Sequence, residues 1–289
     1  MRQPEDIQEL RPDDPDYPAG LVAMPQPPQQ LYLRGQLNGI NDTPCLAVVG
    51  SRRVTPYGKN ITYRLAYEAA KQGIAIISGL ALGVDAIAHR AALDAGGRTV
   101  AVLANGLDDI TPRSNAALGR DIIASGGALV GEYPAGTPAF RPSFVARNRI
   151  VSGLSSGILI TEAVAKSGSL HTANFALGQG KPVLAVPGNI TSPQSAGTNR
   201  LIQTGATPIT CLEDILFALD IAAPTAQQRL VGANDQEQSI LETISSGVSD
   251  IGELQLLSGL DPAVFGQTMT MLEISGKIRP LGAGHYALR

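Results

Sequence analysis

Residues 46–77 read LAVVGSRRVTPYGKNITYRLAYEAAKQGIAII, and this stretch decides the fold. A short apolar run, Leu46–Val49, precedes a glycine turn, and an amphipathic stretch, Gly58–Gln72, leads to a second apolar run, Ile74–Ile77. Buried strands of a parallel sheet are apolar on both faces, whereas the helix that connects them buries one face. The order therefore predicts a β-α-β unit with two parallel strands.

The same alternation continues toward residue 210. Further strand-like runs are Thr99–Leu103, Ala128–Val130, Gly157–Ile160, Pro182–Val186 and a last one near Pro208–Thr210. Further helical stretches are Val84–Ala95 and Leu170–Gly178. The sequence therefore predicts an α/β fold with a doubly wound, mostly parallel sheet. In such sheets ligands bind at the carboxyl ends of the strands, where loops lead into helices.

Composition divides the chain into four segments. We expect residues 1–34 to form an extended arm, 35–221 the sheet domain, 222–234 a linker rich in Pro, Ala and Gln, and 235–289 a small module. The module contains three helical stretches and a hairpin-like end, which are Gln236–Ser245, Ile251–Ser258, Pro262–Ser275 and Lys277–Leu288. Three helices followed by a hairpin predict a winged-helix fold. Asp250 and Asp261 are the expected N-caps of its second and third helices.

The composition indicates a folded protein without membrane spans. No run approaches the ~20 apolar residues of a transmembrane helix, and residues 1–20 are unlike a signal peptide, so we expect a cytoplasmic protein. The two cysteines, Cys45 and Cys211, lie at the edges of apolar stretches, and neither has Cys or His at metal-ligand spacing. We therefore expect core cysteines and neither a metal nor another cofactor.

The net charge of −3 is distributed unevenly along the chain. Residues 35–220 carry 15 basic and 12 acidic side chains, whereas residues 1–34 carry 3 and 6, and residues 235–289 carry 3 and 7. An even distribution would argue against nucleic acid as a partner. A mildly basic sheet domain between two acidic ends leaves that partner open.

Two loops at predicted strand ends carry the residues of an anion site. Gly50-Ser51-Arg52-Arg53 follows the first strand, where glycine permits a tight turn and two arginines reach into the cleft. Lys166-Ser167-Gly168-Ser169 opens a helix, and helix-start N–H groups with a hydroxyl and an ammonium favour phosphate. The fingerprints of dinucleotide and P-loop sites are missing. The alternative is a set of ordinary turns and caps with solvated charges.

Cations and aromatic rings alternate just before the strand Gly157–Ile160. Arg147, Asn148 and Arg149 are candidates for phosphate contacts, because arginine binds phosphate through two nitrogens. Phe140 and Phe144 flank an arginine, an arrangement that lets bases stack while phosphates are neutralised. The alternative for each phenylalanine is an ordinary place in the core.

Asp85 and His89 lie one helical turn apart and could pair as a general base. No Ser or Cys nucleophile stands in a recognisable elbow nearby. Compensation of charge at the helix start is therefore the favoured role for Asp85.

The third helix of the C-terminal module, Pro262–Ser275, occupies the recognition-helix position of a winged helix. It contains neither Lys nor Arg. A helix that reads DNA needs cations for the backbone and polar groups for base edges. We therefore expect this helix to contact protein, or nothing, rather than duplex DNA.

These motifs, in this order, resemble the DNA-processing protein A (DprA/Smf) family. The matching segments are Asp14–Pro18, Leu31–Gly35, Val48–Arg53, Ser78–Ala81, Gly83–Asp85, Ala88–Arg90, Arg147–Ile150, Glu162-Ala163, Ser167–Leu170, Thr172-Ala173 and Ala185–Gly188. The resemblance implies an extended Rossmann-like domain that binds single-stranded DNA in a basic pocket, dimerises, and loads a RecA-type recombinase onto incoming strands in natural transformation, without enzymatic activity. The pocket that it implies comprises Gly50, Ser51, Arg52, Arg53, Phe144, Arg147, Asn148, Arg149, Lys166, Ser167, Gly168 and Ser169.

Three departures from the family pattern stand out. Leu82 occupies a position where the family usually has arginine, which predicts weaker DNA binding. Thr111-Pro112 and Phe144-Val145 replace the usual Tyr-Pro and Phe-Pro. We also expect this chain to lack the N-terminal helical module of many members.

Two other function classes remain open from the sequence. One is a nucleotide-processing enzyme, such as a phosphoribohydrolase on a related scaffold, with Glu162 as the catalytic residue. The expected Pro-Gly-Gly-x-Gly-Thr loop followed by Glu is replaced here by Ser167-Gly168-Ser169 preceded by Glu162. Otherwise Glu162 is a buried partner of Arg149 or of the Ser169 loop. The other class is a protein-interaction scaffold whose arginines serve dimer contacts.

Overall fold

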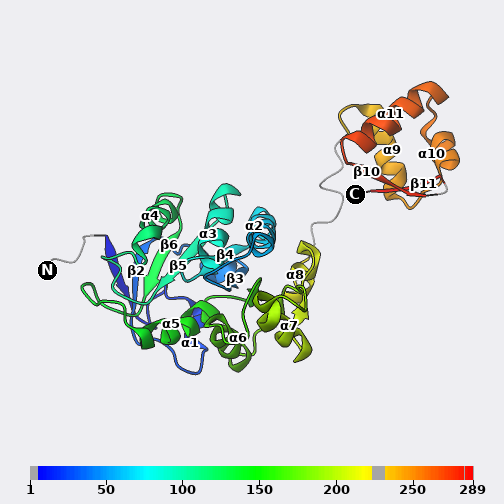
Figure 1. Cartoon of the computed structure of the whole chain (residues 1–289). Helices are drawn as coiled ribbons and strands as arrows, with labels where there is room; N and C mark the ends of the chain where they lie inside the picture. The colour runs from blue at the N-terminus through cyan, green and yellow to red at the C-terminus, as the bar shows by residue number, and fades with distance from the viewer. Residues whose placement is uncertain (1–5, 223–231, 283, 289) are drawn as a thin grey trace. The chain divides into compact units, whose positions relative to one another are not determined.

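The computed structural model describes residues 6–222, 232–282 and 284–288, and most of this part belongs to one large sheet flanked by helices (Figure 1). The strands of the sheet are β1 Ile7–Leu10, β2 Leu31–Gly35, β3 Cys45–Val49, β4 Ala75–Ser78, β5 Thr99–Leu103, β6 Ala128–Gly131, β7 Gly157–Ile160, β8 Val183–Ala185 and β9 Thr207–Pro208. Their spatial order is β1-β2-β6-β5-β4-β3-β7-β8-β9, and all neighbours from β6 to β9 are parallel.

Helices cover both faces of this sheet. They are α1 Ala19–Val22, α2 Pro56–Lys71, α3 Val84–Asp94, α4 Ala116–Ala124, α5 Arg141–Gly153, α6 Ser169–Gly178, α7 Ala196–Gln203 and α8 Leu212–Ala218. On β3, Leu46 and Val48 pack into the core with α2 and α3, whereas Ala47 and Val49 pack with α5 and α6. Successive strand residues face opposite sides, so an apolar run needs helices on both. The predicted α/β fold is confirmed.

The strand order reverses at β3. The chain continues from β3 outward through β4, β5 and β6, and then returns to β7 on the other side of β3. Because β3 and β7 are parallel neighbours, the loops that follow them emerge side by side. One loop leads into α2 and the other into α6, so two helix starts meet at this switch point, where doubly wound sheets bind their ligands.

Residues 1–34 are predicted to form an extended arm, and this prediction is wrong for the described residues. β2 pairs antiparallel with β6, and β1 pairs antiparallel with β2, so both strands extend the sheet. Leu31 and Leu33 are buried in its core, and the hydroxyl of buried Tyr17 donates to the carbonyl of Pro28 at 2.7 Å. An unpaired edge at β6 would leave backbone groups without partners, and these short strands provide them.

The chain divides into two compact units, residues 1–221 and 222–289. The second unit contains α9 Asp235–Ser245, α10 Ile251–Ser258, α11 Pro262–Ile274 and the antiparallel hairpin β10 Ile278–Gly282 with β11 His285–Leu288. The carboxylates of Asp250 and Asp261 accept from N–H groups at the starts of α10 and α11, as predicted. The order of elements is that of a winged helix. No helix in the described ranges is long and apolar enough to cross a membrane.

Candidate functional site

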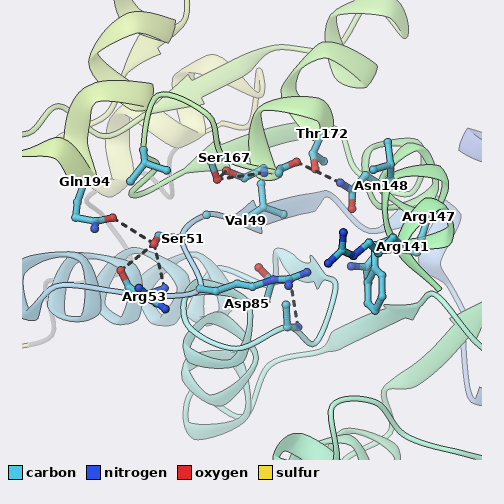
Figure 2. A pocket seen from close by; sticks show the side chains of 18 residues that line it. Val49, Ser51, Arg53, Asp85, Arg141, Arg147, Asn148, Ser167, Thr172 and Gln194 are labelled. Carbon is cyan, nitrogen blue, oxygen red and sulfur yellow. Dashed lines mark hydrogen bonds between the residues drawn. The ribbon is translucent and has the colours of Figure 1, made fainter. Parts of the chain in front are cut away.

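A pocket of about 690 Å³ lies at the switch point between β3 and β7 (Figure 2). Its lining comprises Val49, Gly50, Ser51, Arg52, Arg53, Ala81, Asp85, Arg141, Phe144, Val145, Arg147, Asn148, Val164, Ser167, Gly168, Ser169, Thr172 and Gln194. The structure thus brings together most residues predicted from the two loops and from the segment before β7. Phe140, Arg149 and Lys166 are predicted site residues that are not part of this lining.

The loop Gly50–Arg53 has a fixed backbone from which two arginines project. The N–H of Ser51 donates to the carbonyl of Glu162 at 2.7 Å, and its hydroxyl donates to the carbonyl of Arg53 at 2.8 Å. A Cβ on Gly50 would lie 2.7 Å from the Glu162 carbonyl oxygen, so only glycine allows this close approach. Arg52 and Arg53 are exposed, and the Arg52 guanidinium lies 5.6 Å from the centre of the Phe144 ring.

The loop Ser167–Ser169 faces these arginines from the start of α6. The two serine hydroxyls lie 2.8 Å apart, and the Ser167 hydroxyl also accepts from the N–H of Ser169 at 3.3 Å. One hydroxyl donates to the other, which leaves one hydroxyl hydrogen for a ligand. Asn148 of α5 donates to the carbonyl of Gly168 at 3.4 Å and so connects the loop to α5. The arrangement is suited to an oxyanion.

Helix α5 presents one face to the pocket. Arg141, Phe144, Val145 and Asn148 all line it, and residues three, four and seven apart share one side of a helix. The side chain of Ser143 accepts from the N–H of Phe140, which caps the helix start. Arg141 is exposed and adds a cation that the sequence predictions omit. The helical spacing of these four residues was available as a signal in the sequence.

Arg147 is predicted to contact phosphate, but its side chain is buried in the pocket floor. Its guanidinium donates to the carbonyl of Gly79 at 2.7 Å and also to the carbonyl of Val102. Burial lowers the pKa of Arg147 to about 10, against the opposing charge of Asp85. Arg147 therefore remains cationic at neutral pH while it holds α5 to the ends of β4 and β5.

Arg149 does not belong to the pocket. Its guanidinium donates to Glu132 at 2.5 Å, and both side chains are mostly buried. The sequence predicts phosphate contacts for both Arg147 and Arg149. Residues two positions apart on a helix, however, differ by about 200° around its axis. The helix α5 therefore turns Arg149 away from the pocket.

Phe140 and Lys166 stand outside the pocket lining as well. Phe140 is exposed and meets the ring of Tyr133 edge to face, with centroids 6.0 Å apart. Lys166 is exposed in the loop before Ser167. These two predicted contacts stay predictions.

Asp85 and His89 do not pair. A carboxylate oxygen of Asp85 accepts from the N–H groups of Gly79 at 3.1 Å and Ala81 at 3.4 Å, which shapes the loop before α3. Nδ1 of His89 lies 2.7 Å from the hydroxyl of Thr99. Burial and, secondarily, the charge of Arg147 lower the pKa of His89 to about 3, so the imidazole stays neutral and is a weak base near neutral pH.

Glu162 has a different partner from the two that the sequence suggests. Its carboxylate accepts from the N–H of Thr55 at 2.9 Å and from the Thr55 hydroxyl at 2.6 Å. Neither Arg149 nor the Ser169 loop is the partner. Gly58 leaves room for this carboxylate, since a Cβ there would lie 2.5 Å from it. Glu162 thus fixes the start of α2 against β7.

Two family models match the chain, one for each unit. Residues 8–220 match the model described as DNA recombination-mediator protein A, and residues 222–284 match the DprA winged helix domain. The chain is 38% identical to Protein Smf of Escherichia coli over 287 residues, which covers 96% of this chain and 76% of that protein. It is 41% identical to the DNA processing protein DprA of Bacillus subtilis over 203 residues, or 70% and 68% of the two chains.

Solved structures support the same relationship. The DNA processing protein A of Streptococcus pneumoniae is 35% identical with a TM-score of 0.69, and the match covers 74% of each chain. The Helicobacter pylori protein, described for its single-stranded DNA binding mode, is 35% identical with a TM-score of 0.66, and the match covers 75% of this chain and 97% of that one. The ordered motifs, the sheet and both family models agree, and the chain belongs to the DNA processing protein A family, also called DprA or Smf.

Proposed function

We propose that this chain binds single-stranded DNA in the switch-point pocket and, as a homodimer, loads a RecA-type recombinase onto incoming DNA in natural transformation, without catalysing a reaction. The observation that carries the proposal is the meeting of three exposed arginines, Arg52, Arg53 and Arg141, with the hydroxyls at the start of α6. The family supports it, as does the single-stranded DNA binding described for the Helicobacter pylori relative.

The pocket offers separate contacts to the two parts of a nucleotide. The arginines and the loop Ser167–Ser169 suit phosphate oxygens, since guanidinium groups and helix-start N–H groups both bind them. Phe144, partly exposed beside Arg52, offers a ring face on which a base can stack. Stacking on a side chain requires an unpaired base, so the pocket favours single strands over duplex.

Fluorescence anisotropy tests this proposal with a labelled 20-nucleotide single strand and its duplex. We expect the single strand to bind more tightly, with an affinity that falls as salt rises. Arg52→Ala removes a phosphate contact and is expected to reduce the salt slope by about 0.7. Arg120→Ala, an exposed arginine of α4 away from the pocket, is the matched control. Equal affinity for duplex, or equal effects of the two variants, would refute the proposal.

Delivery to a recombinase and dimer formation need their own measurements. Size-exclusion chromatography with light scattering, with and without oligonucleotide, separates self-association from DNA binding. Strand exchange by a RecA-type recombinase on strands coated with single-strand binding protein measures loading. We expect this chain to accelerate that exchange and Arg52→Ala to lose the acceleration.

The enzymatic alternative depends on Glu162, and its geometry disfavours that role. The carboxylate is buried, accepts hydrogen bonds from Thr55, and does not line the pocket. Turnover of nucleoside monophosphates that disappears in Glu162→Gln would revive the alternative.

A further inference from the structure

The second unit contains a groove of about 330 Å³ between α10 and α11. Its lining comprises Ile251, Gly252, Gln255, Phe265, Gly266, Met269, Thr270, Glu273 and Tyr286. Phe265 and Met269 are buried and belong to the core of the unit, so the floor of the groove is the core itself. Gly266, Thr270 and Glu273 recur at helical spacing, so they share one face of α11.

Two glycines make the groove deep without being required by the fold. A Cβ on Gly266 would meet nothing within 4 Å, and a Cβ on Gly252 would meet only the Asp250 carboxylate at 3.2 Å. Neither residue has a positive φ. Glycine inside a helix is less favourable than alanine, because more backbone freedom is lost on folding. Glycine at position 266 therefore makes α11 less stable than alanine would, and it leaves this space open.

The charge of the unit selects the kind of partner. Residues 235–289 carry 7 acidic and 3 basic side chains. Among the described residues that line the groove, the only charged one is Glu273. Lys277 forms an ion pair with Glu237, with 2.6 Å between Nζ and Oε2. The net negative charge of the unit disfavours duplex DNA, and it disfavours contact between two copies of the unit.

Two exposed apolar side chains follow groove-lining residues in the sequence. Leu256 follows Gln255 and is 80% exposed, and Ile274 follows Glu273 and is 76% exposed. A groove with an apolar floor favours docking of an amphipathic helix, whose anchors recur every three or four residues. A single-stranded DNA site makes no use of these features.

We propose that the groove between α10 and α11 binds an amphipathic helical segment of another protein, with apolar anchors over Phe265 and Met269 and a lysine or arginine beside Glu273. This binding is independent of the DNA pocket. It assigns the winged-helix unit to recognition of a basic peptide rather than of duplex DNA.

A display library of random 16-residue peptides, selected on the full chain, tests the proposal. We expect enriched peptides to carry net positive charge and apolar residues at helical spacing. A synthetic copy of the most enriched peptide should bind Gly266→Leu at least tenfold more weakly, because the leucine fills the groove. Gly266→Ala is the matched control, since one methyl group leaves most of the groove open. Both variants should melt at or above the wild-type temperature, because each residue is a better helix former than glycine.

Several results would overturn the proposal. One is equal binding of the selected peptides to wild type and Gly266→Leu, and another is enrichment of acidic peptides or of none. Loss of self-association in Gly266→Leu by light scattering would identify a second copy as the occupant. Loss of duplex affinity in the same variant would identify DNA.

Discussion

The switch-point pocket and the winged-helix groove are built in opposite ways. The pocket is cationic, and buried polar side chains support it, namely Asp85, Arg147 and Glu162. The groove has an apolar floor and one acidic residue, and it is open at Gly266 because glycine has no side chain. A site for a polyanion needs donors fixed in place, and fixing them requires a buried hydrogen-bond network. A site for an apolar helix needs only open space above a core.

This difference predicts opposite effects of substitution on stability. Arg147→Met leaves the carbonyls of Gly79 and Val102 and the carboxylate of Asp85 without their cation. We expect the free energy of unfolding to fall by about 3–5 kcal/mol, the usual cost of breaking a buried ionic group. Gly266→Ala in the groove should instead raise it by up to about 1 kcal/mol.

Urea denaturation followed by circular dichroism at pH 7 measures both changes. Arg120→Met, at an exposed position of α4, is the control and should lie within about 0.5 kcal/mol of wild type. A loss below about 1 kcal/mol for Arg147→Met would mean that the pocket does not depend on this buried cation.

The two surfaces also differ in what their aromatic rings do. Phe144 lies partly exposed beside Arg52, whereas Phe265 is buried under the groove. Phe144→Ala should weaken single-strand binding by about 1–3 kcal/mol, the usual loss for one stacked base, without changing the salt slope. Phe217→Ala, at an exposed position of α8 outside the pocket lining, is the matched control, with an expected change below twofold. Anisotropy titrations at three salt concentrations provide both quantities, and equal losses in the two variants would show that Phe144 is not a specific stacking site.

Acid should destabilise the fold through His89, which is buried in α3. Its pKa in the folded chain is about 3, below the ordinary value of 6.5, because burial and Arg147 disfavour the charged form. Below pH 6.5 the unfolded chain binds a proton that the folded chain rejects. The contribution of neutral His89 to the free energy of unfolding is therefore fully present above pH 6.5. It declines toward pH 3, by about 1.4 kcal/mol per pH unit in the middle of that range.

Unfolding free energies measured between pH 7 and pH 4 test this decline. His89→Asn keeps a polar atom near the Thr99 hydroxyl and removes the titrating ring. Its stability should fall less steeply over the same range than that of wild type. Parallel curves for the two proteins would assign the decline to other groups.

The sequence predicts the sheet and the winged helix well because apolar periodicity is a local signal. β3 and β7 are continuous apolar runs, and their parallel pairing follows from the helices between them. The position of the loops after these strands can also be predicted, because loops at the carboxyl ends of parallel strands lie at the same edge of the sheet. Segments without such runs were harder to predict, since β1 and β2 become strands only through the edge that β6 offers.

The direction of each side chain depends on contacts between distant segments. Arg147, Asn148 and Arg149 are consecutive in the sequence, yet α5 directs the first into the pocket floor and the third toward Glu132. Glu162 binds Thr55, a residue more than a hundred positions away. Spacing in the sequence does not contain these pairings, so it does not distinguish Arg147 in the pocket floor and Arg149 outside the lining from the exposed arginines.

The smallest expected effect concerns Leu82, which follows a pocket-lining residue and is 48% exposed. Leu82→Arg adds an exposed cation next to the pocket-lining Ala81 and should tighten single-strand binding by roughly 2- to 5-fold at low salt, with a salt slope steeper by about 0.7. Leu281→Arg makes the same change at an exposed position of β10 in the second unit. If the pocket alone holds the strand, the second variant should change affinity much less. Equal gains in anisotropy titrations would show that any added cation helps, and the separation of DNA binding from the winged-helix unit would then be wrong.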